Sequence, residues 1–168
     1  SIAGLENLDT SEVTSMKGFF TSIQVNTLDV SPLDTSQVTD MSYMFSNSNI
    51  NTLDLSGLDA SSVTSMSLMF AGSGISSIDL SNFDTSSVKD MQLMFTSTDN
   101  LKELDLSGIN VSSVTNVQNM LGRKIKQLDL TGLSWDSITS IDSMFSYAES
   151  LEVLNANNMT LKNVTSIG

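Results

Sequence analysis

Acidic side chains recur at a near-constant interval along the sequence, each placed between two apolar residues. The motif L-D-L and its variants give an aspartate about every 25 residues and an asparagine at the sixth position: Asp29, Asp54, Asp79, Asp105, Asp129 and Asn155. Carboxylates can bind a cation, accept hydrogen bonds from a hydroxyl-rich ligand, or work in pairs as general acid and base. Which of these chemistries is available depends on how the chain positions the row.

Polar residues flank each aspartate at the positions that a β-strand would place on the same face. Two residues before the aspartates stand Thr27, Thr52, Ser77, Glu103 and Gln127, and two residues after them stand Ser31, Ser56, Ser81, Ser107 and Thr131. Because side chains alternate along a strand, we expect all three rows to face outward while the apolar residues face inward. The candidate ligand-binding residues are therefore Asp29, Asp54, Asp79, Asp105, Asp129, Thr27, Thr52 and Glu103.

Three interpretations of this aspartate row are open. Like charges roughly 5 Å apart repel by about 1 kcal/mol even in water, so the row calls for compensation. The carboxylates are solvated or hydrogen-bonded to nearby Ser and Thr, or they recognise a basic protein segment or a glycan, or they hold Ca²⁺. The sequence contains neither an EF-hand loop nor a nonapeptide calcium repeat, so we expect no cofactor and keep Ca²⁺ as the weakest of the three.

The composition excludes several classes of function. Cysteine and histidine are both absent, so the chain has no imidazole base, no nucleophilic thiol and no imidazole or thiolate metal ligand, and we do not expect an enzyme. The 19 acidic residues outnumber the 7 basic ones, and a net charge of −12 disfavours nucleic acid and anionic lipid as partners. No apolar run approaches the roughly 20 residues of a membrane helix, so direct membrane insertion is not expected.

The whole chain is an internal repeat. Aligning it on the residue before the second aspartate gives seven copies, numbered 1 to 7 from here on: Leu8, Leu33, Leu58, Phe83, Ile109, Leu133 and Met159. The spacing is 24 to 26 residues, and a fixed period in this range predicts a solenoid in which each copy buries its apolar edge against its neighbours. We therefore expect one repeat domain over residues 1–168, with both terminal copies incomplete and the chain a piece of a longer protein.

Each copy divides into two halves. The first half, for example "INTLDL" over 50–55, predicts a short strand that pairs in parallel with its neighbours. In the second half, Val88, Met91, Met94 and Phe95 fall on one helical face, so the pattern predicts a short helix. A threonine stands where its N-cap belongs in six copies: Thr14, Thr39, Thr64, Thr115, Thr139 and Thr165. One short parallel strand and one short helix per copy make an α/β solenoid of the leucine-rich-repeat type.

Other repeated residues have structural interpretations. A second aspartate row, Asp9, Asp34, Asp59 and Asp84, continued by Asn110, precedes Thr-Ser or a similar pair and suits a turn whose side chain accepts a backbone N–H. The 10 methionines form rows that predict core packing rather than a copper or haem site. Trp135 is interpreted as packed locally, with a partner contact as the alternative. The cluster Arg123, Lys124 and Lys126 is a solvated turn or a contact for an acidic partner.

The copies resemble the BspA-like leucine-rich repeats of bacterial surface proteins, whose motif runs L-D-L-S-x-F-D-T-S-x-V-T-x-M-x-x-M-F. Copies over residues 25–95, such as "LDVSPLDTSQVTDMSYMF", match most closely, and from residue 109 the match weakens, with Asn110 and Ser134 replacing the aspartate. The resemblance implies an extracellular location on the bacterial surface, with the anchor outside this stretch, and adhesion to a protein or glycan on a host or neighbouring cell. It implies no catalytic residues.

Two functions follow as expectations. The first is a non-enzymatic adhesion module that contacts its ligand through the outward sheet face. The alternative is a structural spacer or assembly segment that presents another domain, in which the acidic Ser/Thr surface only keeps the array soluble.

Overall fold

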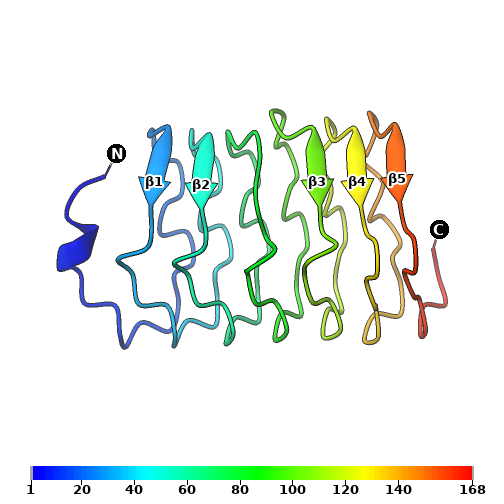
Figure 1. Ribbon diagram of the computed structural model, residues 1–168, viewed down its shortest axis with the longest axis horizontal. Coiled ribbons are helices and arrows are strands. Elements are labelled where there is room, and N and C mark those ends of the chain that lie inside the picture. Colours follow the sequence, from blue (N-terminus) through cyan, green and yellow to red (C-terminus); the bar gives the residue numbers. More distant parts are fainter. Residues whose placement is uncertain (1, 168) are drawn as a thin grey trace.

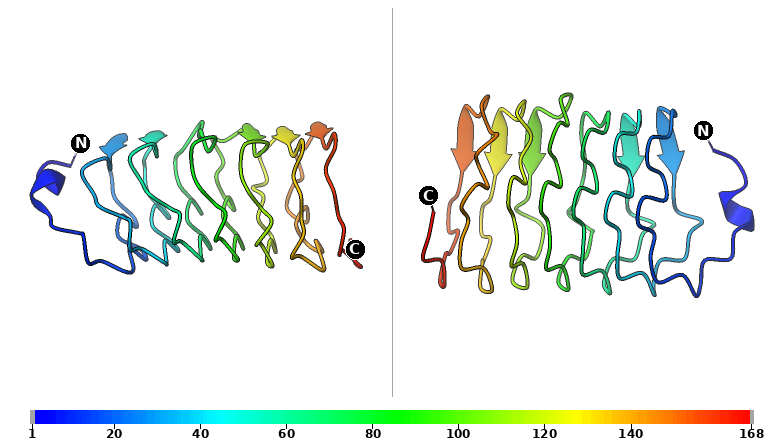
Figure 2. Two further views of the ribbon diagram at one scale, coloured as in Figure 1. Left: turned by 60° about the horizontal axis from the view of Figure 1, so that its bottom comes forward. Right: turned by 180° about the vertical axis from the view of Figure 1, so that it is seen from behind.

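In the computed structural model, which describes residues 2–167, successive copies lie side by side and the two termini lie at opposite ends of the stack (Figures 1 and 2). Each copy is one three-sided coil of the chain. A short 3₁₀ helix, η1 (Leu5–Asn7), precedes the strands β1 (Thr27–Asp29), β2 (Thr52–Asp54), β3 (Glu103–Asp105), β4 (Gln127–Asp129) and β5 (Val153–Asn155). Over the described range, no helix has the length and apolar character needed to cross a bilayer.

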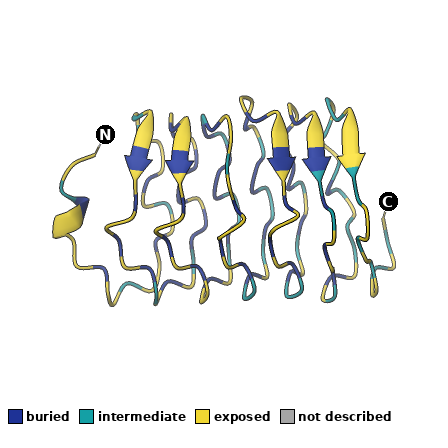
Figure 3. Ribbon diagram, in the orientation of Figure 1, coloured by how far each residue is buried: buried dark blue, intermediate teal, exposed yellow. Residues whose placement is uncertain are grey.

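The predicted parallel strands are present in copies 2, 3, 5, 6 and 7, on one side of the coils, whereas the strand predicted in copy 4 does not form. β1 pairs with β2 so that Leu28 lies beside Leu53, and β3, β4 and β5 form a second sheet. In β1 to β4 a buried leucine stands between two side chains of greater exposure (Figure 3). The alternation of apolar and polar residues therefore predicted the buried face of these strands correctly.

The predicted helix of each copy is wrong. Over residues 41–47, as in the corresponding segments of the other copies, the chain makes consecutive turns instead. The N–H groups of Met41, Tyr43 and Phe45 donate across to the carbonyls of Ser65, Ser67 and Met69 in the next copy, at 3.0, 2.9 and 2.9 Å. These backbone groups bond between copies, so the i→i−4 bonds that define an α-helix do not form.

The spacing of the stack explains the absence of helices. The rings of Phe20, Phe45, Phe70 and Phe95 stack with centroids 5.5 to 5.7 Å apart, on the side where the helices were predicted. Packed helices need axes about 8–10 Å apart, so one helix per copy does not fit at this spacing. A chain of turns does fit, because its width is close to that of a strand in a sheet, about 4.8 Å.

These turns contain left-handed residues, two in each of copies 1 to 4. Tyr43, Leu68 and Leu93 have φ angles of 61°, 55° and 56°. Bulky side chains rarely adopt this region, which costs an L-residue roughly 1–2 kcal/mol. The bonds that the turns make to the next copy and the burial of the adjoining Met and Phe side chains offset this cost.

The core is continuous from copy to copy. The Met rows are buried, at 0 to 3% exposure: Met16, Met41, Met66, Met91, Met44, Met69, Met94, Met120 and Met144. Trp135 is 1% exposed, so its interpretation as locally packed is confirmed and the partner contact is not available to it. The helix periodicity thus predicted which residues are buried, although the backbone that buries them is not helical.

The sheet is interrupted at copy 4. Residues 75–80 form no strand, and the two sheets end on either side of them, at β2 and β3. Within the part of the chain that is described, the N–H groups of Ser77, Ile78, Asp79 and Leu80 have no hydrogen-bond partner. Elsewhere copy 4 remains bonded, for example from Lys89 N–H to the Thr64 carbonyl at 2.9 Å. Hydrogen bonds on its other sides therefore hold copy 4 in the stack.

Because the phenylalanine ladder joins four copies, we expect Phe70→Ala to lower the free energy of unfolding by about 3–5 kcal/mol. The matched control is Phe19→Ala, since Phe19 is 46% exposed beside the same ladder and should cost less than about 1 kcal/mol. Urea denaturation measures both. Equal losses would contradict the packing described above.

Candidate binding face

The outer face is defined here as the three rows of side chains that project from the strand side of the coils, at positions 27, 29 and 31 and their counterparts. The candidate residues predicted from the sequence all lie on it. Exposed side chains are those of Thr27, Thr52, Glu103, Asp29, Asp54, Asp79 and Asp105, and Asp129 is half-buried. The prediction that these rows face outward is confirmed.

Strand register brings some of these side chains together and leaves one apart. Thr27 lies beside Thr52, and Asp29 lies beside Asp54. In the second sheet, Asp105 neighbours Asp129, whose Oδ2 accepts a hydrogen bond from Asn155 at 3.0 Å. Asp79 belongs to copy 4 and pairs with neither sheet. The outer face is thus two ordered arrays with a break between them.

Each aspartate of this row also closes a turn at the end of its strand. Oδ1 of Asp29, Asp54 and Asp79 accepts the backbone N–H two residues later, at 3.0, 2.9 and 2.9 Å. Asp105 and Asp129 do the same at 2.8 Å. Hydrogen bonding to a nearby Ser or Thr is therefore confirmed, with the backbone as donor. A carboxylate accepts about four hydrogen bonds, so this role leaves capacity for a ligand.

The second aspartate row closes the next corner of the coil, as predicted. Oδ1 of Asp34 accepts both the N–H and the hydroxyl of Ser36, at 3.0 and 2.7 Å, and Asp59 binds Ser61 in the same way. Asn110 replaces the aspartate in copy 5 and keeps both bonds, at 3.0 and 2.7 Å. This corner needs an oxygen acceptor and not a charge.

Side chains also close a third corner of the coil, which was not predicted from the sequence. Oδ1 of Asp40 accepts the N–H of Ser42 at 2.8 Å, and Asp90 accepts that of Gln92 at 3.0 Å. In copy 5, Asn116 does the same, and elsewhere a serine hydroxyl serves as acceptor. The signal was available as a recurring Asp, Asn or Ser directly before the first apolar residue of the Met segment. Side chains therefore close three corners in most coils.

Threonines link neighbouring copies instead of capping helices. Oγ1 of Thr39 donates to the Thr14 carbonyl and Oγ1 of Thr64 to the Thr39 carbonyl, at 3.2 and 3.1 Å, so the N-cap interpretation of this row is wrong. Buried Thr35 donates to the Asp59 carbonyl at 2.9 Å and accepts the Asp59 N–H at 2.8 Å. These hydroxyls fix the register between copies.

The corner hydrogen bonds lower the pKa values of four outer-face aspartates, Asp29, Asp54, Asp79 and Asp129. Hydrogen bonding by Ser56, first through its N–H, lowers the pKa of Asp54 below the usual value of 3.8, and the charge of Asp79 opposes this shift. The side chain and backbone of Ser81 lower the pKa of Asp79 in the same way. At neutral pH both groups are anions that repel each other, with no cationic side chain described as bonded to either.

Two residues of the basic cluster, Arg123 and Lys126, are paired within the chain. Lys126 Nζ lies 2.7 Å from Glu152 Oε1, and Arg123 Nε lies 3.7 Å from Glu149 Oε1 while stacking over the Tyr147 ring. Across residues 2–167, no group of three or more acidic side chains is arranged to hold a metal ion. The geometry therefore adds no support to the calcium interpretation.

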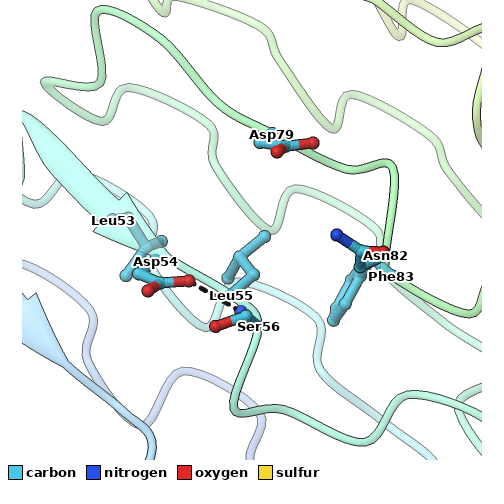
Figure 4. A pocket seen from close by; sticks show the side chains of 7 residues that line it. All are labelled: Leu53, Asp54, Leu55, Ser56, Asp79, Asn82 and Phe83. Atoms are coloured by element: carbon cyan, nitrogen blue, oxygen red, sulfur yellow. Dashed lines mark hydrogen bonds between the residues drawn. The ribbon is translucent and has the colours of Figure 1, made fainter.

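The break in the sheet coincides with hollows in the outer face. One small, open hollow lies between β2 and copy 4, with Leu53, Asp54, Leu55 and Ser56 on one wall and Asp79, Asn82 and Phe83 on the other (Figure 4). Leu53, Leu55 and Phe83 make its floor apolar. The carboxylates of Asp54 and Asp79 and the amide of Asn82 form its rim. A wider, more open depression runs from Ser77 across β3 and β4 to β5.

Comparison with known proteins places the whole chain in one family. Residues 1–75 and 72–168 each match the family described as "Mycoplasma protein of unknown function, DUF285". The chain belongs to the DUF285 family. No curated protein matches the sequence. Among solved structures, the functional domain of InlJ from Listeria monocytogenes, described as including a cysteine ladder, is similar with a TM-score of 0.34 and 20% identity. That match covers 86% of this DUF285 chain and 30% of the InlJ chain.

The corner at Asp59 predicts a difference between two substitutions. Asp59→Asn keeps the acceptor for Ser61, as Asn110 does naturally, and should change the free energy of unfolding by less than about 0.5 kcal/mol. Asp59→Ala removes the acceptor and should cost about 1 kcal/mol. Urea denaturation compares them. Equal destabilisation would show that the charge, rather than the acceptor, matters at this corner.

The lowered pKa values also predict the response to acid. A carboxylate whose pKa is lowered by folding stabilises the protein above its unfolded pKa, near 3.8, and that contribution is lost as the pH falls through the folded value. Unfolding free energy should therefore decline between about pH 5 and pH 2. The variant Asp34→Asn/Asp59→Asn/Asp84→Asn should show a shallower decline, and an unchanged slope would contradict the assignment.

Proposed function

We propose that this chain is a non-enzymatic binding module of a bacterial cell-surface protein, and that its outer face contacts the ligand. The observation that carries the proposal is the set of exposed Asp, Thr and Glu side chains whose backbones are held in register by the sheets and corners. Such preorganisation lowers the entropic cost of binding an extended partner. The finer assignments to a BspA-like, leucine-rich-repeat solenoid and to an extracellular location are part of the same proposal.

The proposal also holds that the chain is not an enzyme. The sequence has no histidine or cysteine, so carboxylates would have to act as both acid and base. Carboxylate pairs that do this need pKa values driven apart, with one raised. The aspartates whose pKa departs from the usual value are all shifted downward, which supports a binding role: Asp9, Asp29, Asp34, Asp54, Asp59, Asp79, Asp84 and Asp129.

A structural spacer or assembly segment is the second candidate. It is favoured by the backbone hydrogen bonds and the phenylalanine ladder that join successive copies, since such an array can hold a distal domain at a fixed position. In that case the outer face has no ligand. The partners under the first candidate are a protein or glycan on a host or neighbouring cell, without nucleic acid.

The two candidates differ in a binding experiment. The chain is tested against matrix proteins, mucins, a glycan array and whole cells, with Ca²⁺ and with chelator. A binding module should saturate on at least one of these, and exchanging Asp54 and Asp79 for Asn should weaken that binding several-fold. The control is Asp59→Asn, which changes charge at a corner away from the outer face. Absence of saturable binding, or equal weakening by the control, would contradict the proposal.

A further inference from the structure

The sequence that lines the hollow between β2 and copy 4 differs from that at the equivalent place in copies 3, 5 and 6. The residue after the outer-face Ser or Thr is glycine in copies 3, 5 and 6, at Gly57, Gly108 and Gly132, but asparagine in copy 4, at Asn82. At Gly57 a Cβ atom would stand only 2.5 Å from Ser31 Cα of the preceding copy. Glycine therefore permits close approach of copy 3 to copy 2, whereas Asn82 brings a Cβ and an amide to the equivalent place beside Ser56.

Two further substitutions in copy 4 line the same region. Ile78 replaces the leucine at the centre of the strands, and Phe83 replaces the smaller apolar residue that precedes the second aspartate elsewhere. On the far side, the interval from Phe83 to Ile109 contains one residue more than the preceding intervals. Copy 4 is thus the copy whose outer side differs from both neighbours, and among copies 2 to 7 it is the one without a strand in the described residues.

We infer that this hollow is a binding site for a lysine or arginine side chain of a partner polypeptide. This inference rests on the proposed binding role of the outer face and specifies its anchor point. Leu53, Leu55 and Phe83 line the hollow and provide an apolar floor for the aliphatic part of such a side chain (Figure 4). Asp54 and Asp79 stand on opposite walls and receive its charged end.

Charge complementarity selects a cation as the occupant. Residues 1–100 carry 12 acidic side chains against Lys17 and Lys89, and Lys89 lies on another side of the coil. Asp54 and Asp79 repel each other across the hollow, so a cation between them replaces a repulsion with two attractions. The nearby unpaired N–H groups of Ser77 to Leu80 offer donors for the carbonyls of the same polypeptide.

The experiment measures binding of an oligolysine peptide by calorimetry at physiological ionic strength, with a lysine-acetylated peptide of equal length as the uncharged comparison. Asn82→Gly removes the side chain that forms part of one wall of the hollow, and Asn82→Phe should fill the hollow. Both variants keep every carboxylate, so weakening of about fivefold or more by both identifies the hollow and not the overall field. Gly132→Asn is the matched control, because Gly132 does not line the hollow and asparagine tolerates its φ of +73° better than most residues do.

Charge variants complete the test. Asp54→Asn and Asp79→Asn should each weaken oligolysine binding by about five- to tenfold, whereas Asp29→Asn, with the same change in charge on the same row, should weaken it less than twofold. Equal effects of all three, or full binding by both Asn82 variants, would overturn the inference while leaving the outer face as a binding surface. Saturable binding of an uncharged glycan in the hollow would also overturn it. If the wild-type chain bound no ligand through its outer face, the proposed function itself would be refuted instead.

Discussion

Backbone hydrogen bonds between neighbouring copies are the constraint on which the rest of this structure depends. They hold copies at the spacing seen in the phenylalanine stack, 5.5 to 5.7 Å, on the side opposite the strands. At that spacing a helix has no room, so the Met segments run as turns that contain left-handed residues. The same spacing puts identical polar side chains beside one another on the outside of the stack, which is the origin of every exposed row.

Most of the polar rows have a structural use before any functional one. Asp54, Asp59 and Asp40 each accept a backbone N–H two residues on, and together they represent the three corners of a coil. Only the first of these rows also lies between exposed hydroxyl rows on a sheet face. The rows share the bond to the backbone N–H, although the second row also accepts a serine hydroxyl, so the first row is distinguished mainly by its surroundings.

The sequence was sufficient for the repeat, the buried positions, the parallel strands and the outward aspartate row. Its apolar period also indicated burial of Met91, Met94 and Phe95 correctly, but the same period is shared by a helix and by these turns, so the backbone was assigned wrongly. Whether this segment forms a helix or turns depends on the spacing between copies, and the sequence of one copy alone does not determine that spacing. The hollow beside Asn82 was missed for a related reason: one Cβ atom matters there only because Gly57 shows how closely neighbouring copies approach.

Amide hydrogen exchange measured residue by residue in the native protein tests the central claim most directly, namely that bonds between copies hold the stack and are interrupted on one side of copy 4. The account predicts strong protection at Tyr43, Phe45 and Phe70, whose N–H groups donate to the next copy. It predicts rapid exchange at Ser77, Ile78, Asp79 and Leu80, which donate to no partner within the described residues. Protection of residues 77–80 equal to that of β2 would show a continuous sheet and would contradict the account.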